Sequence, residues 1–301
     1  MSQPLVIICG ATATGKSSLA INVALEIGAE IINADSMQLY RGMDIGTAKV
    51  TVVERKGVPH HLLDILDVSQ SASVASYQEL ARNKISEIWA RGNPVIIVGG
   101  TGLYIKSIID EMDFPDTDPA IRARLEADAE LLGAAAIFAR LQEQDPEAAA
   151  TIDSANIRRV IRALEVIEAT GKPYSANLPE DVSARYPEAI HIGLEVSRES
   201  LAPRIQARVD HMWDQGFVAE VEDLIKQGLL EGATAQKAIG YSQIIALLNG
   251  EIDESGARES TVTATRQYVR RQETWFKRDT RINWLGEDQP HLQKVLERIN
   301  S

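Results

Sequence analysis

Residues 10–17 constrain this chain more than any other feature, because they match the phosphate-loop (P-loop) pattern G-x-x-x-x-G-K-[ST]. The run before them, 5–9, is short, apolar and β-branched, as is typical of a strand buried on both faces. The residues after them, 17–27, have a helical pattern. The sequence therefore predicts a strand, a phosphate-binding loop and a helix in that order.

The P-loop supplies the chemistry of a di- or triphosphate site. Its glycines let the backbone curl so that successive N–H groups point inward, and the following helix presents its positive end to the same anion. Lys16 can neutralise phosphate oxygens, and the Ser17 hydroxyl is placed to ligate Mg²⁺. The pattern does not distinguish ATP from another diphosphate. The predicted pyrophosphate-binding residues are Gly10, Ala11, Thr12, Ala13, Thr14, Gly15, Lys16 and Ser17.

Further apolar runs at 31–32, 95–98 and 189–196 repeat the strand pattern. We predict an α/β fold with a P-loop kinase-like parallel sheet core flanked by helices. Between the last two runs the chain has only helical patterns, and the longest of these ends at a helix stop, Gly171-Lys172-Pro173. The predicted divisions are a first part of the core at 1–115, an all-helical insertion domain at 116–187 and a mostly helical continuation of the core at 188–301.

Charge is distributed unevenly along the chain. The whole sequence has 31 Lys and Arg against 43 Asp and Glu, a net charge of −12 that argues against a nucleic-acid binder. Residues 110–150 contribute −8, whereas residues 265–281 are at +4 and interleave Tyr268, Trp275 and Phe276 with the charges. If 265–281 forms one helix, four basic residues share a face suited to phosphates. They are Arg266, Arg270, Lys277 and Arg281. The alternative is a solvated helix whose aromatic residues face the core.

Several classes of protein are excluded more simply. No apolar run approaches the roughly 20 residues of a membrane span, and the first ten residues lack a signal-peptide pattern. The single cysteine, Cys9, excludes intramolecular disulfides and a cysteine zinc site. His60 and His61 lack a third metal ligand nearby, so a structural role is expected. We expect a cytoplasmic protein with no membrane association. We also expect a monomer, because the sequence shows no obvious coiled-coil pattern or long apolar patch that would indicate an interface with another subunit.

Two polar residues follow predicted strands, at the edge where α/β sheets bind ligands. A P-loop ATPase would show a strand that ends in a metal-binding aspartate, but the run 95–98 ends in Gly99-Gly100-Thr101. Asp35, after the run 31–32, is a candidate metal ligand or base, against the alternative of a helix cap or solvated loop residue. Thr101 is a candidate hydrogen-bonding partner at a reacting centre, against a turn threonine that caps the next helix.

Taken together, eight motifs that run almost end to end resemble the tRNA dimethylallyltransferases, also called tRNA isopentenyltransferases. They are GATATGKS (10–17), DSMQLY (35–40), GMDIGTAK (42–49), VPHHLLD (58–64), GGTGLY (99–104), RRVIRALEV (158–166), AIGYSQ (238–243) and TRQYVRRQETWFKR (265–278). One departure is Ala11, where that family commonly has proline, but alanine leaves the backbone amides available. The resemblance implies transfer of a dimethylallyl group from its pyrophosphate, held by the P-loop, to the exocyclic amine of the adenosine 3′-adjacent to the anticodon of tRNA.

The resemblance also implies roles for individual residues. Asp35 would take a proton from the acceptor amine, with Thr101 as its hydrogen-bonding partner, while Lys16 and a Mg²⁺ ion at Ser17 would stabilise the leaving pyrophosphate. Gln38 would read the edge of an extruded adenine. The insertion domain and the basic tract would hold the anticodon stem-loop. The predicted tRNA-binding residues are Asp35, Ser36, Met37, Gln38, Arg158, Arg159, Arg162, Gly240, Tyr241, Arg266, Arg270, Arg271, Gln272, Trp275, Lys277 and Arg278.

Two other functions use the same motifs. A P-loop kinase of a small metabolite or nucleotide would consume ATP without tRNA, with the helical insertion as its lid. A non-catalytic RNA-binding protein would use the loop as a nucleotide switch and would bind tRNA without turnover.

Overall fold

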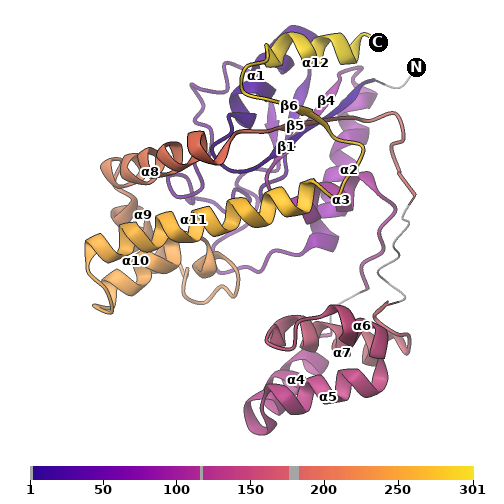
Figure 1. Ribbon diagram of the computed structural model, residues 1–301, viewed down its shortest axis with the longest axis vertical. Coiled ribbons are helices and arrows are strands. Elements are labelled where there is room, and N and C mark those ends of the chain that lie inside the picture. The colour runs from indigo at the N-terminus through magenta and orange to yellow at the C-terminus, as the bar shows by residue number, and fades with distance from the viewer. Residues whose placement is uncertain (1–2, 116–117, 176–182) are drawn as a thin grey trace. The chain divides into compact units, whose positions relative to one another are not determined.

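The computed structural model describes residues 3–115, 118–175 and 183–301 and contains a parallel sheet (Figure 1). Within these residues the sheet has six strands in the order β3-β2-β4-β1-β5-β6. The strands are β1 (Leu5–Gly10), β2 (Glu30–Asn33), β3 (His60–His61), β4 (Val95–Gly99), β5 (Ile190–Leu194) and β6 (Asn283–Leu285). The predicted α/β fold is confirmed, and because β1 lies between β4 and β5, the P-loop leaves the sheet near its middle.

Helices cover both faces of the sheet. All six residues of β1 are buried, and successive side chains point to opposite faces, as the pleat requires. Val6 and Ile8 pack with α1 (Lys16–Ile27) and α12 (His291–Ile299). Ile7 and Cys9 pack on the other face, with α2 (Val74–Ala90) and α3 (Gly102–Ile109). Burial raises the pKa of the Cys9 thiol to about 12, which fits the predicted packing role.

Further helices form a hydrophobic core of their own, together with Tyr40 and Met43 from the chain after β2. They are α8 (Arg198–Asp214), α9 (Phe217–Lys226), the 3₁₀ helix η2 (Ala235–Lys237), α10 (Tyr241–Leu248) and α11 (Glu254–Phe276). The long helix α11 runs from this core back to β1 and α3 (Figure 1). The predicted basic helix face is wrong for Arg281, which follows the end of α11 and forms a 2.7 Å ion pair with Asp279.

Residues 110–184 make a second compact unit, distinct from the unit of residues 1–109 and 185–301. Its described helices are α4 (Pro119–Leu132), α5 (Ala134–Gln144), α6 (Pro146–Thr151) and α7 (Ile157–Thr170). They pack around a small apolar core that includes Leu125 and Leu141. Asp118 caps α4, and Gly171, at φ 67°, ends α7 as predicted. The predicted helical insertion, 116–187, begins and ends slightly later than this unit, and residues 116–117 and 176–182 lie outside the described residues.

None of the helices in the described part of the chain is both long enough and apolar enough to span a bilayer.

Candidate functional site

The P-loop joins β1 to α1 at the carboxyl edge of the sheet. Gly10 has a φ of 139°, and a Cβ atom there would lie 2.9 Å from the carbonyl oxygen of Leu194, so this position requires glycine. The Thr14 hydroxyl donates to the Ala11 carbonyl at 2.9 Å and fixes the turn. Because α1 begins at Lys16, its unpaired N–H groups and positive end add to the loop. The loop therefore has the features of an anion site.

Two cations face this loop. Lys16 donates to the Ala11 carbonyl, and burial, with Arg208 as the next cause, lowers the pKa of Lys16 to about 8. Arg208 comes from α8, and burial lowers its pKa as well, although the Asp35 charge acts in the opposite direction. Both side chains line the same cavity, so a bound polyanion would meet two positive groups with little water between them.

That cavity has a volume of about 180 Å³ and is lined by the P-loop and by the segment after β2. Asp35 and Gln38 line it together with Lys16, Ser17 and Arg208, which places one carboxylate beside the anion site. The Met37 N–H donates to Asp35 Oδ1 at 3.0 Å and orients that carboxylate. Predicted pyrophosphate, metal and acceptor residues thus share one chamber.

Thr101 lies at the start of α3 and contacts the segment that carries Asp35. Its Oγ1 accepts a hydrogen bond from the Ser36 N–H at 3.1 Å, and its hydroxyl donates to Ser36 Oγ at 3.4 Å. Tyr268, from α11, lies near the side chains of Thr101 and Gln272. Burial raises the pKa of Tyr268 to about 12, and the Asp35 charge adds to the effect. Thr101 therefore holds the segment that carries Asp35 against the start of α3.

The inner side of α11 holds the P-loop in place. Gln272 is buried, and its amide bridges two motifs: Oε1 accepts from the Thr12 N–H and Nε2 donates to the Gly100 carbonyl, both at 2.9 Å. The Trp275 ring lies against the backbone of Gly102 and is 41% exposed. Gln272 is one of the predicted tRNA-binding residues, and in the structure both ends of its amide are hydrogen-bonded within the protein.

Other predicted tRNA-binding residues on this unit divide into exposed and buried ones. Gly240 and Tyr241 are buried, and the Tyr241 hydroxyl donates to Glu220 at 2.6 Å. Ser36, Met37 and Gln38 are half-buried in the segment after Asp35. The exposed residues, which form the outer side of α11 and its C-terminal end, are Arg266, Arg270, Arg271, Lys277 and Arg278. Lys277 forms a 3.1 Å ion pair with Glu195.

The three predicted arginines of the helical unit lie on α7. Arg158 and Arg159 are exposed in its first turn, where a phosphate can reach them. Arg162 is half-buried, pairs with Glu165 at 3.1 Å and donates to the Pro115 carbonyl at 2.6 Å. Its guanidinium has a structural task within the unit.

His60 and His61 both form hydrogen bonds within the protein, and His60 also lines the cavity. His61 Nε2 lies 2.6 Å from Glu30 Oε2, and His60 Nδ1 lies 2.8 Å from the Val58 carbonyl. Across residues 3–115, 118–175 and 183–301, no group of three or more His, Cys, Asp and Glu residues is arranged to hold a metal ion.

Comparison with known proteins identifies the family to which this chain belongs. The family model "IPP transferase" matches residues 38–279, most of the chain. The chain belongs to the IPP transferase family. It is 55% identical over 286 residues to the tRNA dimethylallyltransferase of Streptomyces griseus, covering 95% of this chain and 91% of that one. It is 54% identical over 293 residues to the tRNA dimethylallyltransferase of Thermobifida fusca, covering 96% and 91%.

Solved structures agree with this family assignment. The tRNA isopentenylpyrophosphate transferase of Bacillus halodurans superposes with a TM-score of 0.72 at 40% identity, covering 99% of this chain and 95% of that one. A eukaryotic dimethylallyltransferase acting on tRNA gives a TM-score of 0.81 at 26% identity, covering 98% and 78%. The resemblance inferred from eight motifs is therefore confirmed, and the kinase alternative is not supported.

Sequence reasoning missed two residues of this IPP transferase site. Arg208 lines the cavity, and Glu220 holds the loop that borders it. Both lie on helices with ordinary amphipathic patterns, and no short motif marks them. A cation or carboxylate on a helix far along the chain is recognised as part of a site only once the fold brings it there.

Proposed function

We propose that this IPP transferase transfers a dimethylallyl group from dimethylallyl pyrophosphate to the exocyclic amine of the adenosine 3′-adjacent to the anticodon in tRNA. The observation that carries the proposal is the single chamber in which Asp35 lies beside Lys16, Arg208 and the P-loop. An anion site for the donor and a carboxylate for the acceptor are thus within reach of one another. The relatives named as tRNA dimethylallyltransferases support the same reaction.

The donor's pyrophosphate would bind through the P-loop N–H groups, Lys16 and Arg208. These groups stabilise the negative charge that develops on the pyrophosphate as the allylic C–O bond breaks and its electron pair moves to oxygen. The oxygen donors of Ser17 and Asp35 both line the cavity and suit a hard cation, so the site fits Mg²⁺. When bound at Ser17, Mg²⁺ would supply further neutralisation of the leaving group.

The acceptor amine is a weak nucleophile, because its lone pair is delocalised into the adenine ring. As the nitrogen bonds to the allylic carbon, one of its protons must leave, and Asp35, which lines the cavity, would accept it. Thr101 would help to position Asp35, because its hydroxyl is hydrogen-bonded to the N–H of the neighbouring Ser36. The base must leave its stack to enter the chamber, and Gln38 would then pair with the edge of the adenine.

The anticodon stem-loop would be held through its phosphates. On α11 the exposed residues Arg266, Arg270 and Arg271 are available for such contacts, and Trp275 offers a partly exposed ring for stacking. On the helical unit, Arg158 and Arg159 would add to them. A tRNA substrate implies work in the cytoplasm, and we propose a monomer as the active form.

A direct transfer assay tests this proposal. Unmodified tRNA and dimethylallyl pyrophosphate are incubated with the enzyme and Mg²⁺, and the nucleosides are analysed by mass. The expected result is adenosine that has gained one C₅H₈ unit, without consumption of ATP. Phosphorylation of a small molecule by ATP in place of prenyl transfer would overturn the proposal in favour of a kinase.

A further inference from the structure

A carboxylate on α9 holds the backbone that borders the cavity. We call residues 44–48 the shelf loop, since Thr47 and Ala48 line the cavity. Glu220 accepts hydrogen bonds from three consecutive N–H groups of this loop. They are those of Asp44 (3.2 Å), Ile45 (2.7 Å) and Gly46 (3.3 Å). Such convergent N–H groups form an anion nest, and here the protein's own side chain is the anion.

The shelf loop is also packed tightly against α9 and α10. A Cβ atom on Gly46 would lie 2.3 Å from the Phe217 ring and 2.5 Å from the Tyr241 ring, so the loop backbone rests directly on both rings. Burial raises the pKa of Tyr241 well above its usual range, with Glu220 as the next cause. Tyr241 therefore stays protonated and donates to Glu220 Oε1 at 2.6 Å. The motif residue Tyr241 supports the carboxylate that holds the loop.

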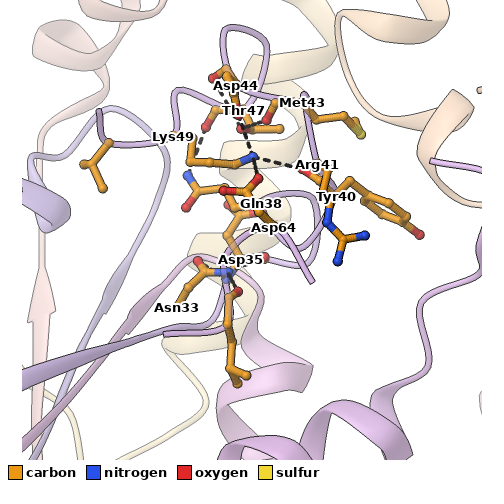
Figure 2. A network of polar contacts seen from close by, with 12 residues as sticks. Asn33, Asp35, Gln38, Tyr40, Arg41, Met43, Asp44, Thr47, Lys49 and Asp64 are labelled. Carbon is orange, nitrogen blue, oxygen red and sulfur yellow. Dashed lines mark hydrogen bonds and ion pairs between the residues drawn. The ribbon is translucent and has the colours of Figure 1, made fainter. Parts of the chain in front are cut away.

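A second anchor lies at the other end of the shelf loop (Figure 2). The side chain of Lys49 is 3% exposed, and its ammonium uses all three donors. It donates to the Tyr40 carbonyl at 2.9 Å, Asp44 Oδ1 at 2.6 Å and Asp64 Oδ1 at 2.5 Å. Since the loop is fixed from both ends, the Thr47 carbonyl within it has little freedom to move.

The carbonyl of Thr47 accepts hydrogen bonds from two residues of the cavity. Gln38 Nε2 donates to it at 3.2 Å and Arg208 Nη2 donates to it at 3.4 Å. This hydrogen bond holds the Gln38 amide, which would face the acceptor base, in one orientation. The same Thr47 oxygen holds the Arg208 guanidinium, which would face the pyrophosphate of the prenyl donor. Displacement of the shelf loop would disturb both substrates together.

We propose that Glu220 is a positioning residue for prenyl transfer, which acts through the shelf loop on Gln38 and Arg208. Among the described residues that line the cavity, Glu220 is absent, so its effect is indirect. The inference rests on the proposed function, because it assigns Gln38 to the base and Arg208 to the pyrophosphate. Charge-assisted hydrogen bonds are about twice as strong as neutral ones, so loss of the carboxylate charge should loosen the loop even when the shape is kept.

The experiment compares Glu220→Gln, Glu220→Ala and Tyr241→Phe with Glu222→Gln, a matched control on the exposed side of the same helix. Hydrogen exchange of the amides of residues 44–46 is measured without substrate, and KM and kcat are measured for tRNA and for the prenyl donor. We expect faster exchange and a roughly tenfold rise in both KM values for Glu220→Gln, a larger rise for Glu220→Ala and a smaller one for Tyr241→Phe. Glu222→Gln should match the wild type.

A double-mutant cycle separates positioning from general stability. In a Gln38→Ala background, Glu220→Gln should no longer raise the KM for tRNA but should still raise the KM for the prenyl donor through Arg208. Independent, multiplicative effects on the tRNA KM would overturn the proposal, as would unchanged exchange at residues 44–46. Because exchange needs no substrate, that result stands apart from any failure of the wild-type enzyme to transfer a prenyl group. If Glu220→Ala fails to fold, Glu220→Gln and Tyr241→Phe carry the test.

Discussion

Donor binding should weaken as the pH rises through about 8, because Lys16 loses its proton there. Burial and, after it, the neighbouring Arg208 guanidinium lower the pKa of Lys16 to about 8, although Asp35 and Cys9 act in the opposite direction. The charged form of Lys16 prevails below this pH and the neutral form prevails above it. Of the two forms of Lys16, only the charged ammonium attracts pyrophosphate, so the affinity for the prenyl donor should be greatest below pH 8.

The size of the effect follows from that pKa. The protonated fraction of Lys16 falls from about 90% at pH 7 to about 10% at pH 9, so the KM for dimethylallyl pyrophosphate should rise about tenfold over this interval. The measurement is the initial rate of prenyl transfer against donor concentration at half-unit pH steps, with tRNA saturating. In Lys16→Arg the cation does not titrate in this range, so its KM should stay flat, whatever its absolute value.

Two variants on α8 test the cause of the shift. Arg208→Met removes the second-largest cause of the lowered pKa of Lys16, so the inflection in KM should move above pH 8, although the KM is higher at each pH. Arg204→Met is the matched control, since Arg204 lies on the same helix and pairs with Glu287 at 2.6 Å, and its inflection should not move. A wild-type KM that is constant from pH 7 to 9, or an inflection that persists in Lys16→Arg, would refute this reasoning.

Three further predictions concern catalysis, tRNA binding and folding. Asp35→Ala should lower kcat by 10²–10⁴-fold at saturating substrates, and a loss under about tenfold would contradict its role as a base. Arg270→Gln with Arg271→Gln should reduce the slope of log affinity for tRNA against log salt by about 2, and an unchanged slope would mean that neither touches a phosphate. Although burial alone would raise it, hydrogen bonds from Asn93, Arg91 and His61 lower the pKa of Glu30 to about 2, so Glu30 stabilises the fold above pH 4.5 and its contribution is lost as the pH falls toward 2. Glu30→Gln should therefore remove the roughly 2 kcal/mol of stability that the carboxylate loses between pH 7 and pH 3, as measured by urea unfolding at both pH values.

The sequence predicts those elements of the fold that have a clear local pattern, such as a continuous apolar run or a helix with a recognisable end. The β1 run is apolar at each position because helices cover both faces of the sheet, so the strand is recognisable without its neighbours. The helix that ends at Gly171 is equally clear, since a left-handed glycine follows its last turn. Strand β3 was not predicted, because it is two residues long and consists of His60 and His61. Nothing in so short a polar pair signals a strand.

The candidate site shows a similar division between local and distant signals. The P-loop could be predicted, because its turn and the start of the following helix require particular residue types, and all of these lie within eight consecutive positions. The roles of Gln272 and Tyr241 could not be predicted, because a sequence motif shows which residues resemble those of the family but not which groups their side chains contact. In the structure their side chains are buried and bond to the P-loop and to Glu220. A polar residue in a basic motif can thus serve the protein's own backbone.

The net charge of −12 does not oppose a tRNA partner, because phosphates respond to charge within about one Debye length, roughly 8 Å at physiological salt. On α11 the exposed side carries Arg266, Arg270 and Arg271, whereas Val269 and Gln272 turn inward. The tRNA would therefore meet a positive surface backed by a rigid helix, while acidic residues beyond that range are screened. An acidic chain of this kind gains little from non-specific contact, so under the proposed function discrimination among RNAs would come from the shaped chamber around Asp35, where the base would have to fit before it reacts.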